Sequence, residues 1–264
     1  MDEQNSPRHN PGHPGTAGVP AAEVLAEVER RRAEARRPIG ESQRRIVILA
    51  DRFIFWLSKR WLAVFNALVL LYVGFPILAP VLMHLGAAGP AMLIHLIYRP
   101  QCNQLPHRSW FLFGPQFTYT PLEIMELAGI GVLQDPRQAG TFVGNESMGY
   151  KMALCERCTA IYGAIFIFGL LYALGRRRVR PLPWWAYIGF GLVPMLLDGG
   201  YQFLSYALPL FWPDCPIAPY ETTPAMRLIT GALFGLATVW LAYPLVQETM
   251  DEFHETLQRR FGWK

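Results

Sequence analysis

Charge is scarce in this chain, and one long stretch lacks it altogether. Charged residues make up 17% of the 264 residues, against 52% for hydrophobic ones, and none lies between Trp61 and Met83. A helix needs about 20 apolar residues to cross the hydrocarbon core of a bilayer. This stretch therefore predicts a spanning helix. Pro76 and Pro80 are compatible with it, because neighbouring helices in a membrane protein can satisfy the freed carbonyl groups.

Three further runs are almost free of charge: residues 159–175, residues 184–208, interrupted only by Asp198, and residues 228–247. Four such apolar runs in one chain are not expected of a soluble domain. The pattern predicts an all-α, polytopic membrane helix bundle with about four spans. Residues 87–98 are also apolar but number only about a dozen, which favours a short re-entrant or interfacial helix over a fifth span.

Lysine and arginine are absent from residues 208–226, whereas they crowd the region before the first span, the short loop at residues 176–180 and the last six residues. Because Lys and Arg accumulate in short cytoplasmic flanks, we expect both termini and the 176–180 loop to be cytoplasmic. The loop at 208–226 and the segment at 86–153 are then outside. This arrangement indicates a multi-pass membrane protein with its N- and C-termini in the cytoplasm.

The expected organisation has four parts. Residues 1–42 form a polar, partly disordered cytoplasmic arm without a cleavable signal, so the first span should itself direct insertion. Residues 43–60 form an interfacial amphipathic helix, residues 61–247 the membrane bundle with an outer loop at 99–153, and residues 248–264 an amphipathic cytoplasmic tail. The basic arm is expected to lie near anionic lipid, and no nucleic-acid partner is expected.

Cysteines are few, and the expected topology places all four on the outer side: Cys102, Cys155, Cys158 and Cys215. An even number of cysteines on an oxidising side is typical of disulfides, and three pairings are open. Arg157 lies inside the Cys-x-x-Cys pair at the start of an apolar helix, where the helix N-terminus and the guanidinium favour a thiolate. Structural disulfide or inert thiols, metal binding and redox catalysis all remain alternatives.

A metal site would need further ligands, and residues 98–114 contain two candidates. Cys102 and His107, added to Cys155 and Cys158, would give three thiolates and one imidazole, a set that suits tetrahedral zinc. The alternative is that His107 is a surface loop residue. The adjacent Arg108 would by default be bound locally or by lipid phosphate.

Asp198 stands about 20 Å along its predicted helix, in the outer half of the bilayer. An ionisable group at that depth is expensive, and it usually has a partner or faces a water-filled cavity. Asp198 is therefore either a functional group or one member of an ion pair with Arg157 or Arg227. Gln202 lies one turn further on the same face.

Four motifs occur in order: C-x-Q-x-P-x-R-S-x-F-x-x-G at residues 102–114, C-x-R-C-T-x-I-Y-G at 155–163, D-G-x-x-Q at 198–202 and R-x-x-T-G at 227–231. Over roughly residues 60–247 the chain thus resembles the DUF2085 family of uncharacterised bacterial integral membrane proteins. Members usually have His where this chain has Asn103, and some carry Asp at the position of Cys158. The resemblance implies a location in the bacterial cytoplasmic (inner) membrane and no particular reaction.

The functional hypotheses fall into different classes, and the sequence does not decide whether the protein is an enzyme. The first is a structural or metal-binding membrane protein, alone or as a subunit of a membrane complex, with zinc as the metal. The second is a quinone-linked thiol-disulfide oxidoreductase, with Cys155 and Cys158 as the redox pair and Cys102 and Cys215 as the shuttle pair. A small-solute transporter is a third, supported by Asp198 alone.

Overall fold

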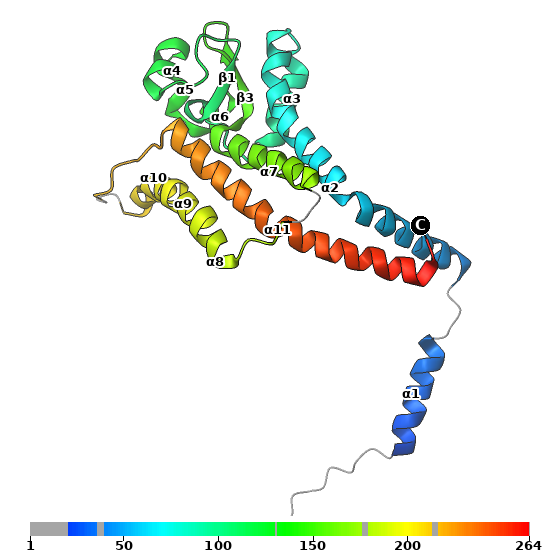
Figure 1. Ribbon diagram of the computed structural model, residues 1–264. Coiled ribbons are helices and arrows are strands. Elements are labelled where there is room, and N and C mark those ends of the chain that lie inside the picture. Colours follow the sequence, from blue (N-terminus) through cyan, green and yellow to red (C-terminus); the bar gives the residue numbers. More distant parts are fainter. Residues whose placement is uncertain (1–20, 36–39, 130, 176–178, 213–215, 264) are drawn as a thin grey trace, which may run out of the picture. The chain divides into compact units, whose positions relative to one another are not determined.

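The computed structural model describes residues 21–35, 40–129, 131–175, 179–212 and 216–263, and these residues are mostly helical (Figure 1). The chain divides into two compact units, Met1–Arg52 and Phe53–Lys264. The first contains α1 (Ala21–Ala35), and α2 (Glu41–His84) runs through the boundary. Cys215 and Arg176, Arg177 and Arg178, on which part of the sequence argument rests, lie outside the described residues.

Three of the described helices are long and apolar enough to cross a membrane: α2, α7 (Glu156–Leu174) and α11 (Pro224–Phe261). Each contains one of the apolar runs predicted from the sequence. The flanking segments that we expected to be amphipathic are continuous with two of these spans, since α2 begins at Glu41 and α11 ends at Phe261. The described helices thus include three candidate spans rather than four.

The fourth apolar run folds as consecutive short helical segments. They are α8 (Trp184–Ala186), η2 (Tyr187–Leu192), α9 (Val193–Met195), η3 (Leu196–Gly200) and α10 (Tyr201–Phe211), of which η2 and η3 are π-helical. Pro194 cannot donate the hydrogen bond of a regular α-helix, which accounts for a widened turn nearby. Wide turns of this kind occur often at functional sites, and Asp198 lies in η3.

A small sheet corrects the all-α expectation. The segment between α3 (Ala88–Tyr98) and α7, expected as an outer loop with turns, contains an antiparallel sheet of order β1-β3-β2. The strands are β1 (Ser109–Leu112), β2 (Gly144–Asn145) and β3 (Gly149–Cys155). Gly149 has φ +81°, and a Cβ there would lie 2.3 Å from the Leu112 carbonyl oxygen. The sequence pattern missed the sheet because β1 has only 4 residues and pairs with a strand that begins more than 35 residues later.

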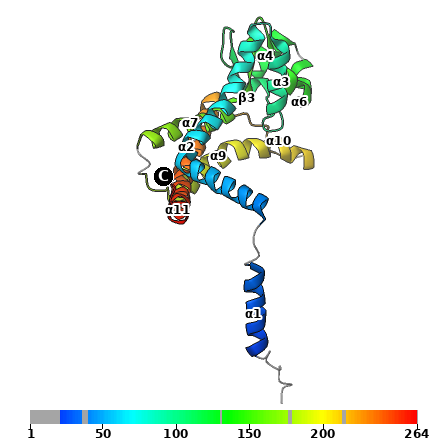
Figure 2. The same ribbon diagram turned by 90° about the vertical axis from the view of Figure 1, so that its right-hand side faces the viewer.

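Short helices accompany the sheet: η1 (Pro106–Arg108), α4 (Pro121–Ala128), α5 (Gly131–Gln134) and α6 (Pro136–Thr141). Thr120 and Glu123 form a capping box that fixes the start of α4. Phe111, Tyr119, Ile124 and Met148 make a buried cluster between sheet and helices. Figures 1 and 2 show β3, α3 and α4 gathered at one end of the second unit, where α7 begins.

Helices α7 and α11 pack closely along the line of a G-x-x-x-G motif. A Cβ on Gly231 would lie 2.8 Å from the Arg157 carbonyl oxygen, and one on Gly235 would lie 2.3 Å from that of Ile161. Small residues at this spacing let two membrane helices approach backbone to backbone. The matching offsets, 157 to 231 and 161 to 235, mean that both helices run in the same direction and start at the same end.

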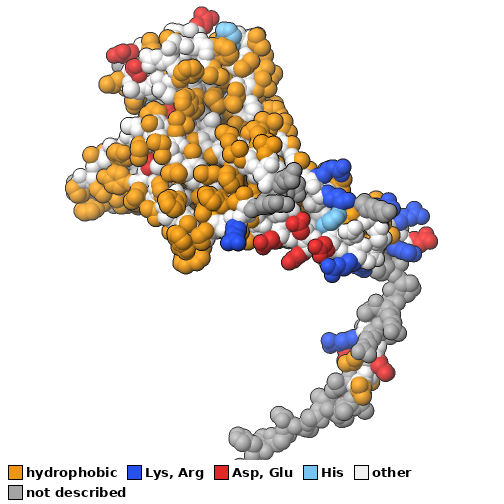
Figure 3. Space-filling model, in the orientation of Figure 1, with side chains coloured by type: hydrophobic (Ala, Val, Ile, Leu, Met, Phe, Trp, Pro, Cys, Tyr) orange, Lys and Arg blue, Asp and Glu red, His pale blue; other side chains and the backbone are white. Residues whose placement is uncertain are grey.

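Helix α2 joins this pair through Trp61 and Leu62, which pack with Tyr172, Val239 and Tyr243. The Trp61 indole N–H donates to Gln247 Oε1 at 3.0 Å. In the second unit, hydrophobic side chains cover most of the visible face, and charged ones gather where the end of α11 lies beside α2 (Figure 3). Such an apolar surface is what lipid contact requires.

Candidate metal and ion-pair site

Three cysteines meet where α7 begins. Cys102 follows α3, Cys155 is the N-cap of α7, and Cys158 lies in the first turn of that helix. Their sulfur atoms all lie within 4.8 Å of one another. The sheet explains the meeting, because Ser109 pairs with Cys155 and so draws the 102–108 segment against the end of β3. The apolar cluster of Ala79, Tyr98, Ala153 and Leu154 packs beside the cysteines.

Hydrogen bonds favour a thiolate at Cys102. The Cys155 backbone N–H donates to Cys102 Sγ at 3.3 Å, and hydrogen bonds from the Cys155 and Cys158 thiols lower the pKa of Cys102 well below its usual value. Three thiolates about a metal ion at Zn–S distances of about 2.3 Å would lie about 3.8 Å apart in tetrahedral geometry. The observed limit of 4.8 Å is about 1 Å wider than this, and thiolate sulfur suits Zn²⁺ and Cu⁺. The arrangement can therefore hold a metal.

A buried lysine supports the same corner. Lys151 is completely buried, and its ammonium donates to the carbonyl oxygens of Gln104 at 2.6 Å and Gly140 at 3.1 Å. Burial lowers the pKa of Lys151 to about 7, and the negative charge of the Cys102 thiolate opposes part of that shift. A positive charge at this place offsets the net negative charge that three thiolates give to a divalent metal.

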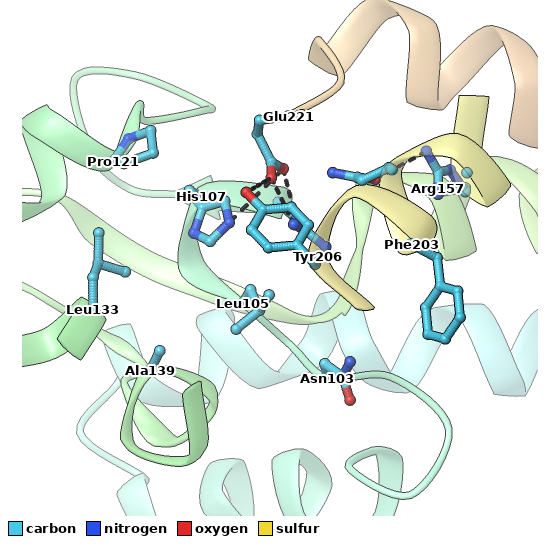
Figure 4. Close-up of a pocket in the computed structure, with 13 residues that line it drawn as sticks. Asn103, Leu105, His107, Pro121, Leu133, Ala139, Arg157, Phe203, Tyr206 and Glu221 are labelled. Atoms are coloured by element: carbon cyan, nitrogen blue, oxygen red, sulfur yellow. Dashed lines mark hydrogen bonds and ion pairs between the residues drawn. The ribbon is translucent and has the colours of Figure 1, made fainter. Parts of the chain in front are cut away.

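Arg227 lies at the centre of an ion-pair network. Its Nη1 donates to Glu156 Oε2 at 2.9 Å and its Nη2 to Glu221, and the exposed fractions of the Arg227 and Glu156 side chains are 3% and 0%. Its Nε donates to Thr222 at 2.8 Å. Glu221 also receives two hydrogen bonds of 2.6 Å from Arg108 (Figure 4). The network ties the beginnings of α7 and α11 to the 102–108 segment.

The structure pairs Asp198 with Arg157, one of the two partners considered from the sequence. Arg157 Nη2 donates to Asp198 Oδ2 at 2.6 Å, and the Thr230 hydroxyl donates to the same oxygen at 3.0 Å. Gln202 Oε1 accepts from Arg157 at 3.4 Å. A Cβ on Gly199 would lie 2.6 Å from Arg157 Nη1, so glycine at this position leaves room for the guanidinium.

His107 lies beside Glu221, with Nε2 at 3.8 Å from Oε1. Burial lowers the pKa of His107 to about 4 although Glu221 acts in the opposite direction. Burial alone would raise the pKa of Glu221, but hydrogen bonding and charge from Arg108, with His107 and Arg227, outweigh it and lower that pKa. The structure thus brings together the three cysteines and places His107 in the neighbouring ion-pair network.

Two cavities adjoin the site. One of about 220 Å³, here called the cysteine cavity, is lined by the three cysteines and by Arg108, Arg157 and Arg227. The second, of about 630 Å³, is lined by His107, Tyr206 and Glu221 among others (Figure 4). Five residues line both: Asn103, Leu105, Arg108, Arg157 and Gln202. The two cavities therefore share a polar wall.

Sequence reasoning missed Glu156, Glu221 and Lys151. Glu156 lies within the Cys-x-x-Cys pair, so its position was a signal in itself, but a Glu in the first turn of a helix is usually a solvated residue that favours the helix dipole. Nothing local marks Glu221 or Lys151 as site residues, because Glu221 binds the distant Arg108 and Lys151 binds the distant Gln104.

Acid should destabilise the protein through its buried histidines. Burial lowers the pKa of His95 to about 4, as it does for His107. The pKa of histidine in the unfolded chain is about 6.5, so between pH 6.5 and pH 4 only the unfolded chain binds these protons. The free energy of unfolding is therefore highest above pH 6.5 and falls as the pH drops towards 4. Each histidine contributes at most about 3 kcal/mol.

Thermal unfolding between pH 7.5 and 4.5, with chelator present throughout, measures this effect. His95→Gln should flatten the dependence of the midpoint on pH, whereas His84→Gln, at an exposed position, should not. Equal pH dependence in the wild type and His95→Gln would contradict the assignment.

Comparison with known proteins agrees with a membrane location. Residues 146–241 match a family described as "Predicted membrane protein (DUF2085)", the family that the sequence motifs resemble. An uncharacterized protein of Methanocaldococcus jannaschii is 22% identical over 213 residues, which cover 78% of this chain and 99% of that protein. That organism is an archaeon, so the comparisons do not confirm the bacterial source expected from the sequence. No solved structure matches the chain.

Proposed function

We propose that this chain is a multi-pass membrane protein that holds a zinc ion on Cys102, Cys155 and Cys158. The observation that carries the proposal is the gathering of three sulfur atoms within 4.8 Å at the start of α7. The N–H donor to Cys102 and the buried Lys151 support it, since both favour the deprotonated form of Cys102 and a metal requires deprotonated ligands. No specific reaction is attached to the ion.

The proposed topology has four spans. Three are the apolar parts of α2, α7 and α11, and the fourth is residues 184–208, whose helical segments follow one another directly. The arginine distribution in the sequence favours cytoplasmic termini. With that orientation the beginnings of α7 and α11, the sheet and the cysteine cavity lie on the outer side of a cytoplasmic membrane. In this proposal His107 is a member of the ion-pair network and is not a metal ligand.

Metal analysis of the purified full-length protein tests this function. The wild type should contain about one zinc ion per chain. Cys102→Ser should lose it, because two thiolates bind zinc far more weakly than three. His107→Gln should keep it, which makes this variant the control for the ligand set.

Alkylation with and without reductant, read by mass spectrometry, runs beside the metal analysis. Chelator should make Cys102, Cys155 and Cys158 reactive without reductant. Absence of zinc from the wild type, or reactivity that appears only after reduction, would contradict the proposal and favour a disulfide.

A further inference from the structure

The cysteine cavity is lined by three arginines as well as by the three cysteines. Arg108, Arg157 and Arg227 line it, and among its described lining residues there is no Asp or Glu. The carboxylate partners of these arginines are Glu221, Asp198 and Glu156, none of which lines this cavity. The carboxylates hold the guanidinium groups in place, and all three arginines line the same cavity.

Two hydrogen-bond donors beside that space have no partner within the described protein. Gln202 is 3% exposed, and its Nε2 is buried without a hydrogen bond; the same is true of Arg157 Nε. In this orientation of the Gln202 amide, Oε1 accepts from Arg157, which an amide nitrogen could not do. A buried donor without a partner is costly, and such groups often belong to a binding site.

The backbone adds to the positive potential. α7 and α11 both begin at this site, and their aligned dipoles attract negative charge. The adjoining 630 Å³ cavity offers a different surface. Figure 4 shows the apolar side chains of Pro121 and Leu133 on one side of it and Phe203 on the other. A ligand with an anionic head and room for an apolar remainder fits the pair of cavities.

We propose that the wall shared by the two cavities binds an oxyanion of the phosphate class, with its oxygens accepting from Arg108, Arg157 and Gln202. Arg227 contributes charge, because its Nε, Nη1 and Nη2 atoms already donate to protein oxygens. The ligand is either free phosphate or the phosphate headgroup of a lipid, since both present the same oxygens. This site does not require the proposed zinc ion.

Titration calorimetry of the full chain in a nonionic detergent tests the site at low salt. One arm uses inorganic phosphate. The other uses micelles containing dioleoylphosphatidic acid, with dioleoylglycerol, which lacks the phosphate, as the matched lipid. If inorganic phosphate binds, the ligand is a free anion. If phosphatidic acid binds and inorganic phosphate does not, the ligand is a lipid headgroup.

Gln202→Glu is the decisive variant. It keeps an oxygen that accepts from Arg157 but replaces the unpartnered donor with a negative charge. We expect phosphate or phosphatidic acid to bind at least about tenfold more weakly, the range for a charge-assisted hydrogen bond. Gln258→Glu adds the same charge at an exposed position on α11 and should bind like the wild type.

The unfolding midpoint and zinc content of Gln202→Glu are measured in parallel, so loss of anion binding is distinguished from loss of fold or of metal. No binding of either probe to the wild type, or unchanged binding in a folded Gln202→Glu, would overturn the proposal. If the wild-type protein lacks zinc but still binds phosphate, only the proposed metal centre is contradicted.

Discussion

Replacement of Arg227 with methionine is expected to destabilise the protein by about 3–5 kcal/mol, the usual effect of removing one member of a buried ion pair. Arg227 is bound to Glu156, whose side chain is completely buried, and to Glu221. Without the guanidinium, Glu156 would be left as an unpaired charge next to the cysteines. Most of the loss in the free energy of unfolding comes from the buried, unpaired Glu156 carboxylate. The lost attraction between Arg227 and Glu156 contributes less.

Unfolding in mixed micelles of increasing SDS content measures this destabilisation. The double variant Arg227→Met with Glu156→Gln should recover part of the loss, because the stranded charge is then neutral. Arg260→Met, at an exposed position near the end of α11, should have little effect. An Arg227→Met protein with wild-type stability, or a double variant less stable than Arg227→Met alone, would show that Glu156 is not charged in the folded protein.

Substitution of Gly235 by leucine should separate α7 from α11. Even a Cβ at this position would lie 2.3 Å from the Ile161 carbonyl oxygen and 3.1 Å from its carbon, and backbone atoms cannot move aside as a flexible side chain can. Overpacking usually destabilises by about 1–3 kcal/mol and sometimes by more, and leucine against backbone should reach about 3 kcal/mol or more. Since α7 carries Cys155 and Cys158, zinc should be lost as well.

Gly163→Leu is the matched control, because Gly163 lies on α7 and a Cβ there meets no atom within 4 Å. It should keep both stability and zinc. The same SDS titration and metal analysis compare the two variants. If both lose zinc equally, the close approach at Gly235 is not what positions the cysteines.

The spans and the polar residues of the site were largely predictable from the sequence. A helix makes its hydrogen bonds within its own segment, so a charge-free stretch such as Trp61 to Met83 identifies a spanning helix without knowledge of its neighbours. Asp198 and the Cys-x-x-Cys pair could also be identified from the sequence, because a charge or a pair of thiols within or next to an apolar run is unusual. The segmented helix at 184–211 was less predictable, since its wide turns depend on local backbone geometry.

By itself the sequence thus determined the apolar helices and most of the residues with chemistry. The tertiary structure alone decided which of them meet: Cys102 with the pair 53 and 56 residues further on, Arg157 with Asp198, and Arg227 with Glu156. It also decided that 109–112 and 149–155 form strands, because a strand is stable only when paired. Contacts between distant residues leave no local pattern, so the partner of a buried charge emerges only when the helices and the sheet are packed.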